Sequence, residues 1–267
     1  MPDAAATIPE TTSSGFAGWQ SNLRCPDCGR EFASETAWEC RSCGFRSPSP
    51  RDLRPIRPQV RSHPFDLTQL KNPERELEGI TVGPPKIVYD GPCPGRSPQL
   101  VFSALAAHCG RGSRLLDLGC GPRDQAEPAA HMSYEYLGID YSNAKADLLA
   151  DAHALPFAGG SFDAVLSFAV FEHLHNPFLA IREVSRILKP GGVFVGVVSQ
   201  GEPFHESYFH HTAWGVIALA ASTGELDVAQ MWPSRDTLLA LARMSRYSKV
   251  VKLSLRMLDV FNRNTPF

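Results

Sequence analysis

The sequence lacks any long apolar run and any large excess of charge of one sign, and its glycine and proline together stay below the range of low-complexity segments. No stretch approaches the roughly 18 consecutive apolar residues of a membrane-spanning helix, so we expect no membrane span. The first 16 residues contain neither a basic region nor an apolar core, which argues against a secretory signal and predicts a cytoplasmic protein. In a reducing compartment the seven cysteines are expected to be thiols or metal ligands, not disulfides.

The overall composition is that of a globular protein, with 43% hydrophobic and 20% charged residues and a net charge of −2. The charge is unevenly distributed, because residues 97–234 carry 14 acidic and 7 basic side chains whereas residues 235–267 carry 2 and 7. An acidic body argues against a polyanion as the main ligand. Fourteen of the 22 prolines lie in the first hundred residues, where they disrupt helices and sheet ladders and predict an extended connector.

Two C-x-x-C pairs, separated by eleven residues, lie near the start of the chain: Cys25, Cys28, Cys40 and Cys43. Each pair is followed by a glycine, which can take the positive φ that such turns require. Four thiolates complete a tetrahedral Zn²⁺ shell with no open position, so a structural zinc ribbon is predicted. The alternative, a pair of redox motifs, requires a βαβ context that is absent here.

Residues 41–61, at the end of the cysteine segment and just after it, contain six arginines and one acid: Arg41, Arg46, Arg51, Arg54, Arg57, Arg61 and Asp52. These arginines form a candidate phosphate-contacting strip. No aromatic residue lies between Arg46 and Arg61, whereas binding of single-stranded RNA would prefer aromatic side chains for base stacking. We favour the alternative interpretation, a solvated linker.

From Ser97 onward, helix and strand patterns alternate. Strands are expected at 114–118, 136–140, 164–168 and 193–199, a helix follows Ser97 and ends near Gly110, and another begins at Asn176 and stops at a Lys-Pro-Gly-Gly sequence. This alternation predicts a parallel, doubly wound α/β sheet.

Acidic residues and glycines close the first two of these strands. Asp117, Gly119 and Gly121 end the first strand, and Asp140 ends the second. Glycines at this edge let the backbone approach a ligand, and a carboxylate beside them suits a cationic amino group better than a pyrophosphate. A second-strand carboxylate can accept hydrogen bonds from both hydroxyls of a ribose.

Four segments, RLLDLGCGP, YLGIDYS, DAHALPFAGGSFDAVLSFAVFEHL and RILKPGGVFV, resemble the successive motifs of class I S-adenosylmethionine-dependent methyltransferases over residues 97–200. Residues 23 to about 60 also resemble the zinc ribbons that precede the catalytic domain in some methyltransferases. The fold implied is a Rossmann-like methyltransferase sheet preceded by a small four-cysteine zinc ribbon, with S-adenosylmethionine as cofactor. A nicotinamide enzyme is disfavoured because Asp124 stands at the third glycine position of G-x-G-x-x-G.

The resemblance implies a cofactor-binding set by position. The methionine end is framed by Asp117, Gly119 and Gly121, the ribose is held by Asp140, and the remaining contacts come from Cys120, Tyr141, Asp151, Ala152 and Phe168. Cys120 is expected to be a small residue filling the glycine loop, because a nucleophile would need a nearby base and a lowered pKa. Only ten residues separate Asp140 from Asp151, too few for a full helix, so the adenine side is expected to be loop-like or open.

Histidines after the later strands are the candidate general bases, with His173, His205 and His210 as first choices and His211 beside them. His173 has an equally plausible role in supporting the backbone. The stretch around Tyr208 and Thr212 resembles a family pattern, Asp-Tyr-aromatic-Arg-Phe-Thr-Pro. Because four of its positions are replaced here, their family roles do not transfer.

Five segments are expected from these observations: a disordered N-terminus (1–20), a zinc ribbon (21–50), a Pro/Arg-rich connector and lid (51–96), an S-adenosylmethionine-binding core (97–200), and a substrate-facing loop with C-terminal helices (201–267). A strand at 226–231 and a helix at 235–263 are expected in the last segment, whose final sheet strand the pattern does not place.

The function that these features favour is methyl transfer to a small molecule through an oxygen, nitrogen or carbon nucleophile. The alternatives are an RNA methyltransferase that docks through its zinc ribbon, and a noncatalytic S-adenosylmethionine-binding protein. The sequence predicts neither the acceptor nor the oligomeric state.

Overall fold

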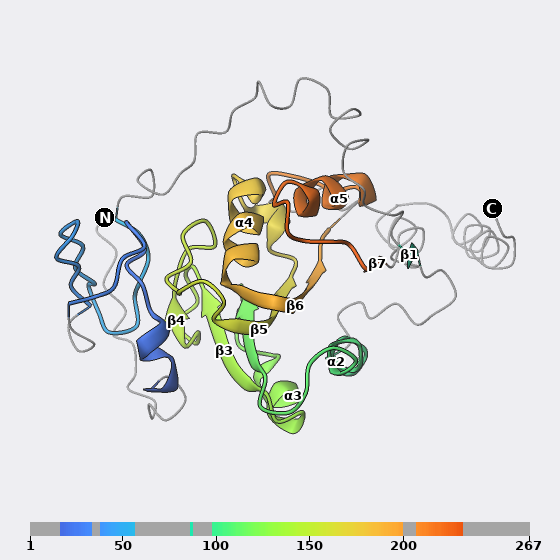
Figure 1. Cartoon of the computed structure of the whole chain (residues 1–267), viewed down its shortest axis with the longest axis horizontal. Helices are drawn as coiled ribbons and strands as arrows, with labels where there is room; N and C mark the ends of the chain where they lie inside the picture. Colours follow the sequence, from blue (N-terminus) through green and yellow to red (C-terminus); the bar gives the residue numbers. More distant parts are fainter. Residues whose placement is uncertain (1–16, 34–37, 57–85, 88–97, 200–206, 232–267) are drawn as a thin grey trace, which may run out of the picture.

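The computed structural model describes residues 17–33, 38–56, 86–87, 98–199 and 207–231. Within these ranges the chain folds around a five-stranded sheet (Figure 1), whose strands run parallel in the order β4-β3-β2-β5-β6. The strands are β2 (Arg114–Leu118), β3 (Glu135–Asp140), β4 (Leu148–Leu149), β5 (Phe162–Phe168) and β6 (Leu188–Val197). The predicted α/β Rossmann-like sheet is confirmed.

Helices cover both faces of this sheet (Figure 1). Pro98–Ala106 (α2) and Ala126–His131 (α3) lie on one face, and Pro177–Ile187 (α4) and Ala213–Ala221 (α5) lie on the other. Sandwiched strands need apolar side chains on both sides, which explains the fully buried Leu115, Leu116 and Leu118 of β2. No helix in the described ranges is long and apolar enough to cross a membrane.

The start of α4 follows from its local sequence. The Asn176 side chain accepts a hydrogen bond of 3.1 Å from the Leu179 amide, and Pro177 occupies the first turn, where its missing N–H costs nothing. The helix buries one face, formed by Pro177, Ala180, Ile181, Glu183, Val184, Ser185 and Ile187. The predicted helix start is therefore confirmed.

Several predicted element boundaries are wrong. Strand β5 begins at Phe162 and not at residue 164, and strand β6 ends at Val197 and not at residue 199. Strand β6 begins at Leu188 and not at Val193, because Leu188 already pairs with Phe162 of β5 before the register shifts to the pair Ala164 and Val193. Helix α2 ends at Ala106, before the predicted stop at Gly110.

Short elements flank the main sheet. Of the strand expected at 226–231, only Gln230–Met231 (β7) is formed, and it pairs in parallel with Lys86–Ile87 (β1) in a separate sheet. Residues Ala17–Asn22 form a 3-10 helix, η1, and Phe171–His173 form another, η4. The start of η1 lies in the segment expected to be disordered, and it is fixed because Trp19 is buried. The predicted helix at 235–263 lies outside the described residues.

The cysteine segment forms a small lobe beside β4, drawn in blue in Figure 1. Each C-x-x-C pair turns tightly, because the amide of the following glycine, Gly29 or Gly44, donates to the carbonyl of Cys25 or Cys40 at 2.7 and 2.9 Å. Both glycines have positive φ, as the motif predicts. The buried Trp38 and Phe45, packed against Phe32, give this lobe an apolar centre.

Candidate cofactor site and cysteine cluster

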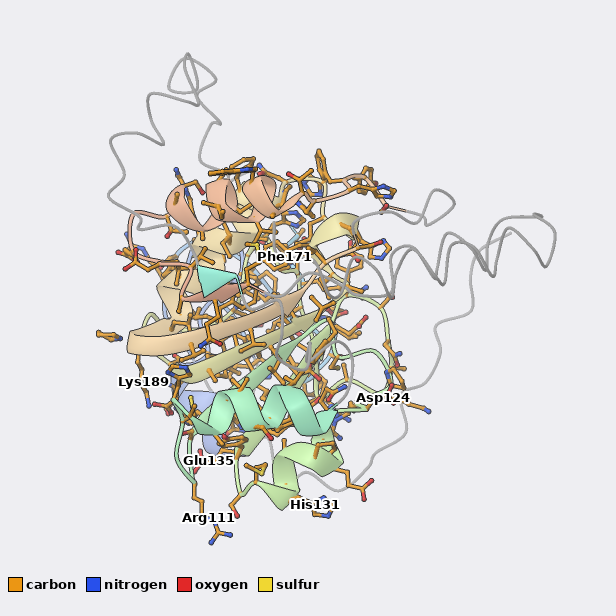
Figure 2. The ribbon with its side chains drawn as sticks, turned by 90° about the vertical axis from the view of Figure 1, so that its right-hand side faces the viewer. Arg111, Asp124, His131, Glu135, Phe171 and Lys189 are labelled. Atoms are coloured by element: carbon orange, nitrogen blue, oxygen red, sulfur yellow. The ribbon has the colours of Figure 1, made fainter. Side chains whose placement is uncertain are left out.

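The carboxyl ends of β2 and β3 bring the predicted acidic residues to one edge of the sheet. Figure 2 shows Asp124, in the loop after β2, at one end of the strands, and Glu135 and Lys189, near the starts of β3 and β6, at the other end. The register pairs Asp117 with Gly138 and Leu118 with Ile139, so Asp117 and Asp140 end neighbouring strands. Ligands of open α/β sheets bind at such an edge.

Asp117 is buried and hydrogen-bonded. Its Oδ2 accepts a bond of 2.7 Å from the Tyr136 hydroxyl. Burial raises the pKa of Asp117 to about 6, although the Tyr136 bond lowers it in part, and the negative charges of Asp124 and Asp140 raise it further. The carboxyl group is therefore about half ionised near pH 6. A cation bound beside it would favour its ionised form and lower its pKa.

Tyr136 is a site residue that sequence analysis missed. Its hydroxyl reaches Asp117 across Gly138, where a Cβ would lie within 2.8 Å of that hydroxyl and 2.9 Å of the Cys120 sulfur. Position 138 therefore requires glycine, because any side chain would collide with Tyr136 and Cys120. Side chains two residues apart on a strand share a face, so Tyr136 and Gly138 lie on the same face of β3. This alternation is the sequence signal that would have identified Tyr136 as a site residue.

Asp140 organises two loops at the same edge. Its Oδ2 accepts from the Gly121 amide at 3.0 Å, and its Oδ1 accepts from the amides of Ser142 and Asn143, both at 2.9 Å. The side chain is only half-buried, so its lone pairs stay within reach of a ligand. Asp140 therefore joins the glycine loop to the segment that follows β3.

The glycine loop lies across the end of β3, since the amides of Gly119 and Cys120 both donate to the Ile139 carbonyl at 2.9 Å. Gly119 has a φ of 72°, and a Cβ there would overlap the Val170 side chain. Cys120 is buried, and burial together with the neighbouring carboxylates raises its pKa. A buried thiol of this kind is a poor nucleophile, as expected.

Asp151 and Ala152 are expected at the adenine, and Phe168 is expected to line the loop after its strand. Asp151 Oδ1 accepts from the His153 amide at 2.9 Å and lies 2.7 Å from His153 Nδ1, and these bonds lower the pKa of Asp151 although burial opposes them. His153 Nε2 accepts from the Asn176 amide at 3.3 Å, so Nδ1 carries the proton. Sequence analysis missed His153, which fixes the orientation of Asp151.

The rest of this region is loop-like. Ala152 is buried, and Phe168 is the last residue of β5. No helix forms between Asp140 and Asp151, as the short spacing predicts. The cysteine segment contacts the end of this region through the bridge between Asp52 and Leu149, while Tyr141, at its start, stays 61% exposed.

Only two of the three first-choice candidate bases, His173 and His210, lie within the described residues. His173 ends η4 and is half-buried, His210 is exposed, and His205 lies outside the described residues. Two further titratable residues of this region, Glu172 and His211, are buried. Sequence analysis passed over Glu172, although an acid inside an apolar stretch is a signal of a specific role.

Glu172 connects β6 to the segment around Tyr208. Its Oε1 accepts from the Ser199 amide at 3.1 Å, and its carbonyl accepts from the amides of Tyr208 and Phe209 at 2.8 and 3.1 Å. Within the described part of the chain, Glu172 Oε2 and His211 Nε2 are buried without a hydrogen-bond partner. Such atoms are costly unless a ligand or another group satisfies them.

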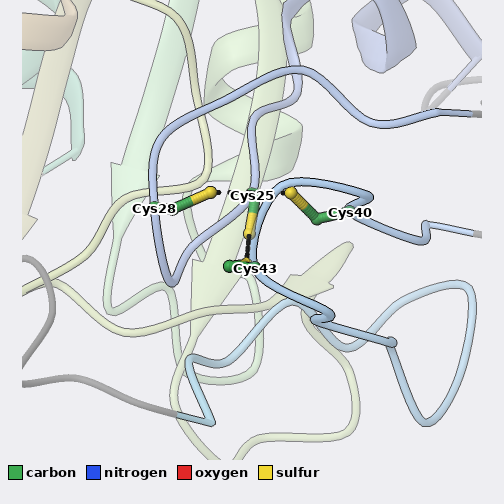
Figure 3. Close-up of side chains that lie close together, drawn as sticks. All are labelled: Cys25, Cys28, Cys40 and Cys43. Atoms are coloured by element: carbon green, nitrogen blue, oxygen red, sulfur yellow. Dashed lines mark hydrogen bonds between the residues drawn. The ribbon is translucent and has the colours of Figure 1, made fainter.

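The four cysteines gather as the spacing predicts (Figure 3). Their sulfur atoms all lie within 4.8 Å of one another, and the pairs Cys25–Cys43 and Cys28–Cys40 are each 3.5 Å apart. A tetrahedral zinc with bonds of about 2.3 Å places its sulfurs about 3.8 Å apart. The donor set and its dimensions therefore fit one zinc ion.

Comparison with known proteins connects this edge of the sheet to a family. Residues 116–196 match the family model described as a methyltransferase domain. The chain is 29% identical to a demethylmenaquinone methyltransferase from Renibacterium salmoninarum over 162 residues, covering 52% of this chain and 68% of that protein. It is 33% identical to a ubiquinone biosynthesis O-methyltransferase from Cereibacter sphaeroides over 105 residues, covering 32% and 40%.

A solved S-adenosylmethionine-dependent methyltransferase from Mesorhizobium loti is 26% identical and covers 37% of this chain and 53% of that one, with a TM-score of 0.32. The similarity to most of the curated relatives spans less than half of their length. The family model matches residues 116–196, a range that includes Asp117 and Asp140.

Proposed function

We propose that the chain transfers a methyl group from S-adenosylmethionine to a small-molecule acceptor, because residues 116–196 match a methyltransferase domain. The observation that carries the proposal is the pair of carboxylates at successive strand ends. Asp117 would hold the ammonium group of the cofactor, and Asp140 would hold its ribose hydroxyls. A Cβ at Gly121, beside Asp140, would meet open space, so the loop leaves room there for a ligand.

The cofactor supplies a methyl group on a sulfonium, and its transfer is an in-line displacement. The chain must therefore align the acceptor, exclude water and, where the acceptor carries a proton, take that proton. His173 and His210 remain the proposed bases, together with His205. We assign acceptor binding to the region of Glu172 and His211, because a polar group of the acceptor would satisfy their unpartnered atoms.

An apolar or aromatic small molecule suits this region. Tyr208, Phe209 and Trp214 are exposed here, an unusual accumulation of aromatic surface. Two relatives are named for the methylation of demethylmenaquinone and for ubiquinone biosynthesis, which supports a small-molecule acceptor.

The RNA alternative loses part of its support in the structure. Of the six arginines in the candidate strip, Arg51 and Arg54 contact the body of the protein, and Arg46 pairs with Glu39 at 3.1 Å. Fewer guanidinium groups are then free for phosphate contacts. Salt-dependent binding to RNA would revive this interpretation.

We also propose that the cysteine cluster, Cys25, Cys28, Cys40 and Cys43, holds a structural zinc. All four ligands of the cluster are sulfur, and four ligands fill the tetrahedral shell of a zinc ion. With no coordination position left for a substrate, the ion would stabilise the fold.

Replacement of Asp140 by Ala tests the proposed function. We expect the variant to bind S-adenosylhomocysteine about 10- to 150-fold more weakly, because hydrogen bonds to a charged group contribute about 1.5–3 kcal/mol. Calorimetry gives the affinity, and transfer of label from S-adenosylmethionine into cell extract gives the activity. Asp227→Ala, which changes an exposed acid after α5, is the matched control; equal affinities of the Asp140→Ala and Asp227→Ala variants would contradict the ribose assignment.

Cofactor binding is expected to depend on pH through Asp117. The ammonium of the cofactor pairs with the ionised carboxylate, so below the pKa of about 6 binding must expel a proton, and affinity should fall by about tenfold per pH unit. From about pH 6.5 to about pH 7.5 the affinity should be nearly flat. In Tyr136→Phe the hydrogen bond that lowers this pKa is lost, so the fall should begin at a higher pH. Calorimetry from about pH 5 to about pH 7.5 that shows constant affinity would rule out this role of Asp117.

A further inference from the structure

The cysteine lobe, residues 23–56 without 34–37, extends the main sheet beyond its edge strand β4. Leu53 N–H donates to the Leu149 carbonyl, and Leu149 N–H donates to the Arg51 carbonyl, both at 2.8 Å, in a parallel bridge centred on Asp52 and Leu149. An exposed edge strand needs such a partner. Figure 1 shows the lobe beside β4.

A second attachment fixes the lobe at another place. Leu23 and Phe157 form an antiparallel bridge, with bonds of 2.9 Å from Arg24 N–H to the Pro156 carbonyl and of 2.7 Å from Ala158 N–H to the Asn22 carbonyl. Two separate backbone attachments hold the lobe in one orientation, so its side chains have defined positions on the body.

The lobe contacts residues 141–147, which connect β3 to β4. Residues 141–147 form no helix, and the Arg51 guanidinium binds two of their carbonyl groups instead. Its Nε donates to the Asp147 carbonyl at 2.9 Å and its Nη2 to the Ala146 carbonyl at 3.1 Å. The shape of a segment without helical hydrogen bonds is thus determined in part by an arginine from the lobe.

Arg54 fixes the other end of this segment. It is oriented by Asp52, which accepts from its Nε at 2.9 Å and from its Nη2 at 2.7 Å. Its Nη1 donates to the Tyr141 carbonyl at 3.3 Å, and its guanidinium lies 5.6 Å from the centre of the Tyr141 ring. Tyr141 directly follows Asp140, so Arg54 acts on the backbone beside the proposed ribose carboxylate.

A chain of contacts continues from Arg51 to the other carboxylate. Asp147, whose carbonyl Arg51 binds, accepts from the Gly138 amide at 2.9 Å and pairs with Arg123 at 3.0 Å. The Arg123 guanidinium lies 5.5 Å from the centre of the Tyr136 ring, and Tyr136 donates to Asp117. The lobe is therefore connected to both ends of the proposed cofactor site.

We propose that the cysteine lobe is a structural part of the cofactor site and that Arg51 and Arg54 are its positioning residues. They hold residues 141–147 in the shape that presents Asp140 and Tyr141 to the adenosyl group. This inference rests on the proposed function, because the ligand is S-adenosylmethionine. It gives the lobe a role in binding the cofactor, distinct from docking RNA.

The test compares the Arg51→Ala/Arg54→Ala double variant with Arg46→Ala in the full-length, metal-loaded chain. Arg46 belongs to the same lobe, but its side chain is 77% exposed and pairs only within the lobe, with Glu39, among the described residues. The double variant loses several hydrogen bonds that orient the site, so S-adenosylhomocysteine should bind at least about tenfold more weakly. The cofactor KM should rise while kcat at saturation changes little, and Arg54→Lys should recover only part of the affinity.

Hydrogen exchange of the amides in 138–149 provides a readout that needs no ligand. We expect exchange to accelerate in the double variant and to stay unchanged in Arg46→Ala, with metal content equal in all. Wild-type affinity in the double variant would overturn the proposal. If the wild type binds no S-adenosylhomocysteine, the proposed function fails, and unchanged exchange in the double variant would separately overturn the coupling of the lobe to this segment.

Discussion

Gly119→Ala is expected to lower the free energy of unfolding by about 2–5 kcal/mol and to abolish measurable cofactor binding. An L-residue at a φ of 72° costs about 1–2 kcal/mol, and forcing a methyl group into a packed position costs about 1–3 kcal/mol more. The added Cβ would overlap the Val170 side chain and displace the loop that Asp140 holds through Gly121.

The control for Gly119→Ala is Gly112→Ala. Gly112 has a φ of 77° but open space where a Cβ would stand, so this variant should show the backbone strain without the overlap and should bind the cofactor normally. Val170→Ala in the Gly119→Ala background should restore part of the stability. Denaturant unfolding and calorimetry give the two quantities; equal stabilities of the two glycine variants would show that the contact with Val170 is unimportant.

Cys40→Ser is expected to remove the metal almost completely. Zinc binding contributes about 10–16 kcal/mol to the folding of small Cys/His modules, and a serine hydroxyl does not replace the fourth thiolate. The lobe should then unfold and the protein should lose stability, because the buried apolar residues of the lobe belong to the core on one face of the sheet. The sheet should keep its structure, because the core on its other face, around α2 and β2, contains no residue of the lobe. Because the lobe positions residues 141–147, cofactor affinity should fall with it.

Metal analysis of the purified protein, together with circular dichroism, tests this expectation. The wild type should carry one zinc per chain, and Cys109→Ser, which changes a buried cysteine outside the cluster, should carry the same amount. Wild-type protein without zinc, or a Cys40→Ser variant with a full complement, would contradict the assignment of the cluster.

Local patterns predicted the elements that depend on local sequence. The strand 114–118 and the start of α4 are confirmed, because an apolar run with clear ends and an Asn-Pro cap determine them within a few residues. The predicted start of β6 is wrong because Leu188, which precedes Lys-Pro-Gly-Gly, already pairs with Phe162 of β5. Backbone pairing between distant segments has no local signature.

The same distinction applies to the site. The acidic residues and glycines at the ends of β2 and β3 are predicted from their order along the chain, and the geometry brings Asp117 and Asp140 to one edge. From the sequence, Arg51 and Arg54 are interpreted as part of a solvated linker. Their partners on the body lie far along the chain, so no local pattern predicts these contacts. Such contacts depend on how the lobe docks, which composition and spacing do not determine.

A crystal structure of the chain with S-adenosylhomocysteine tests the central claim most directly. The account predicts that the ligand lies across the carboxyl ends of β2 and β3, with its ribose hydroxyls on Asp140 and its amino group at Asp117. A ligand bound elsewhere, or crystals grown at saturating ligand in which this edge contains none, would contradict it.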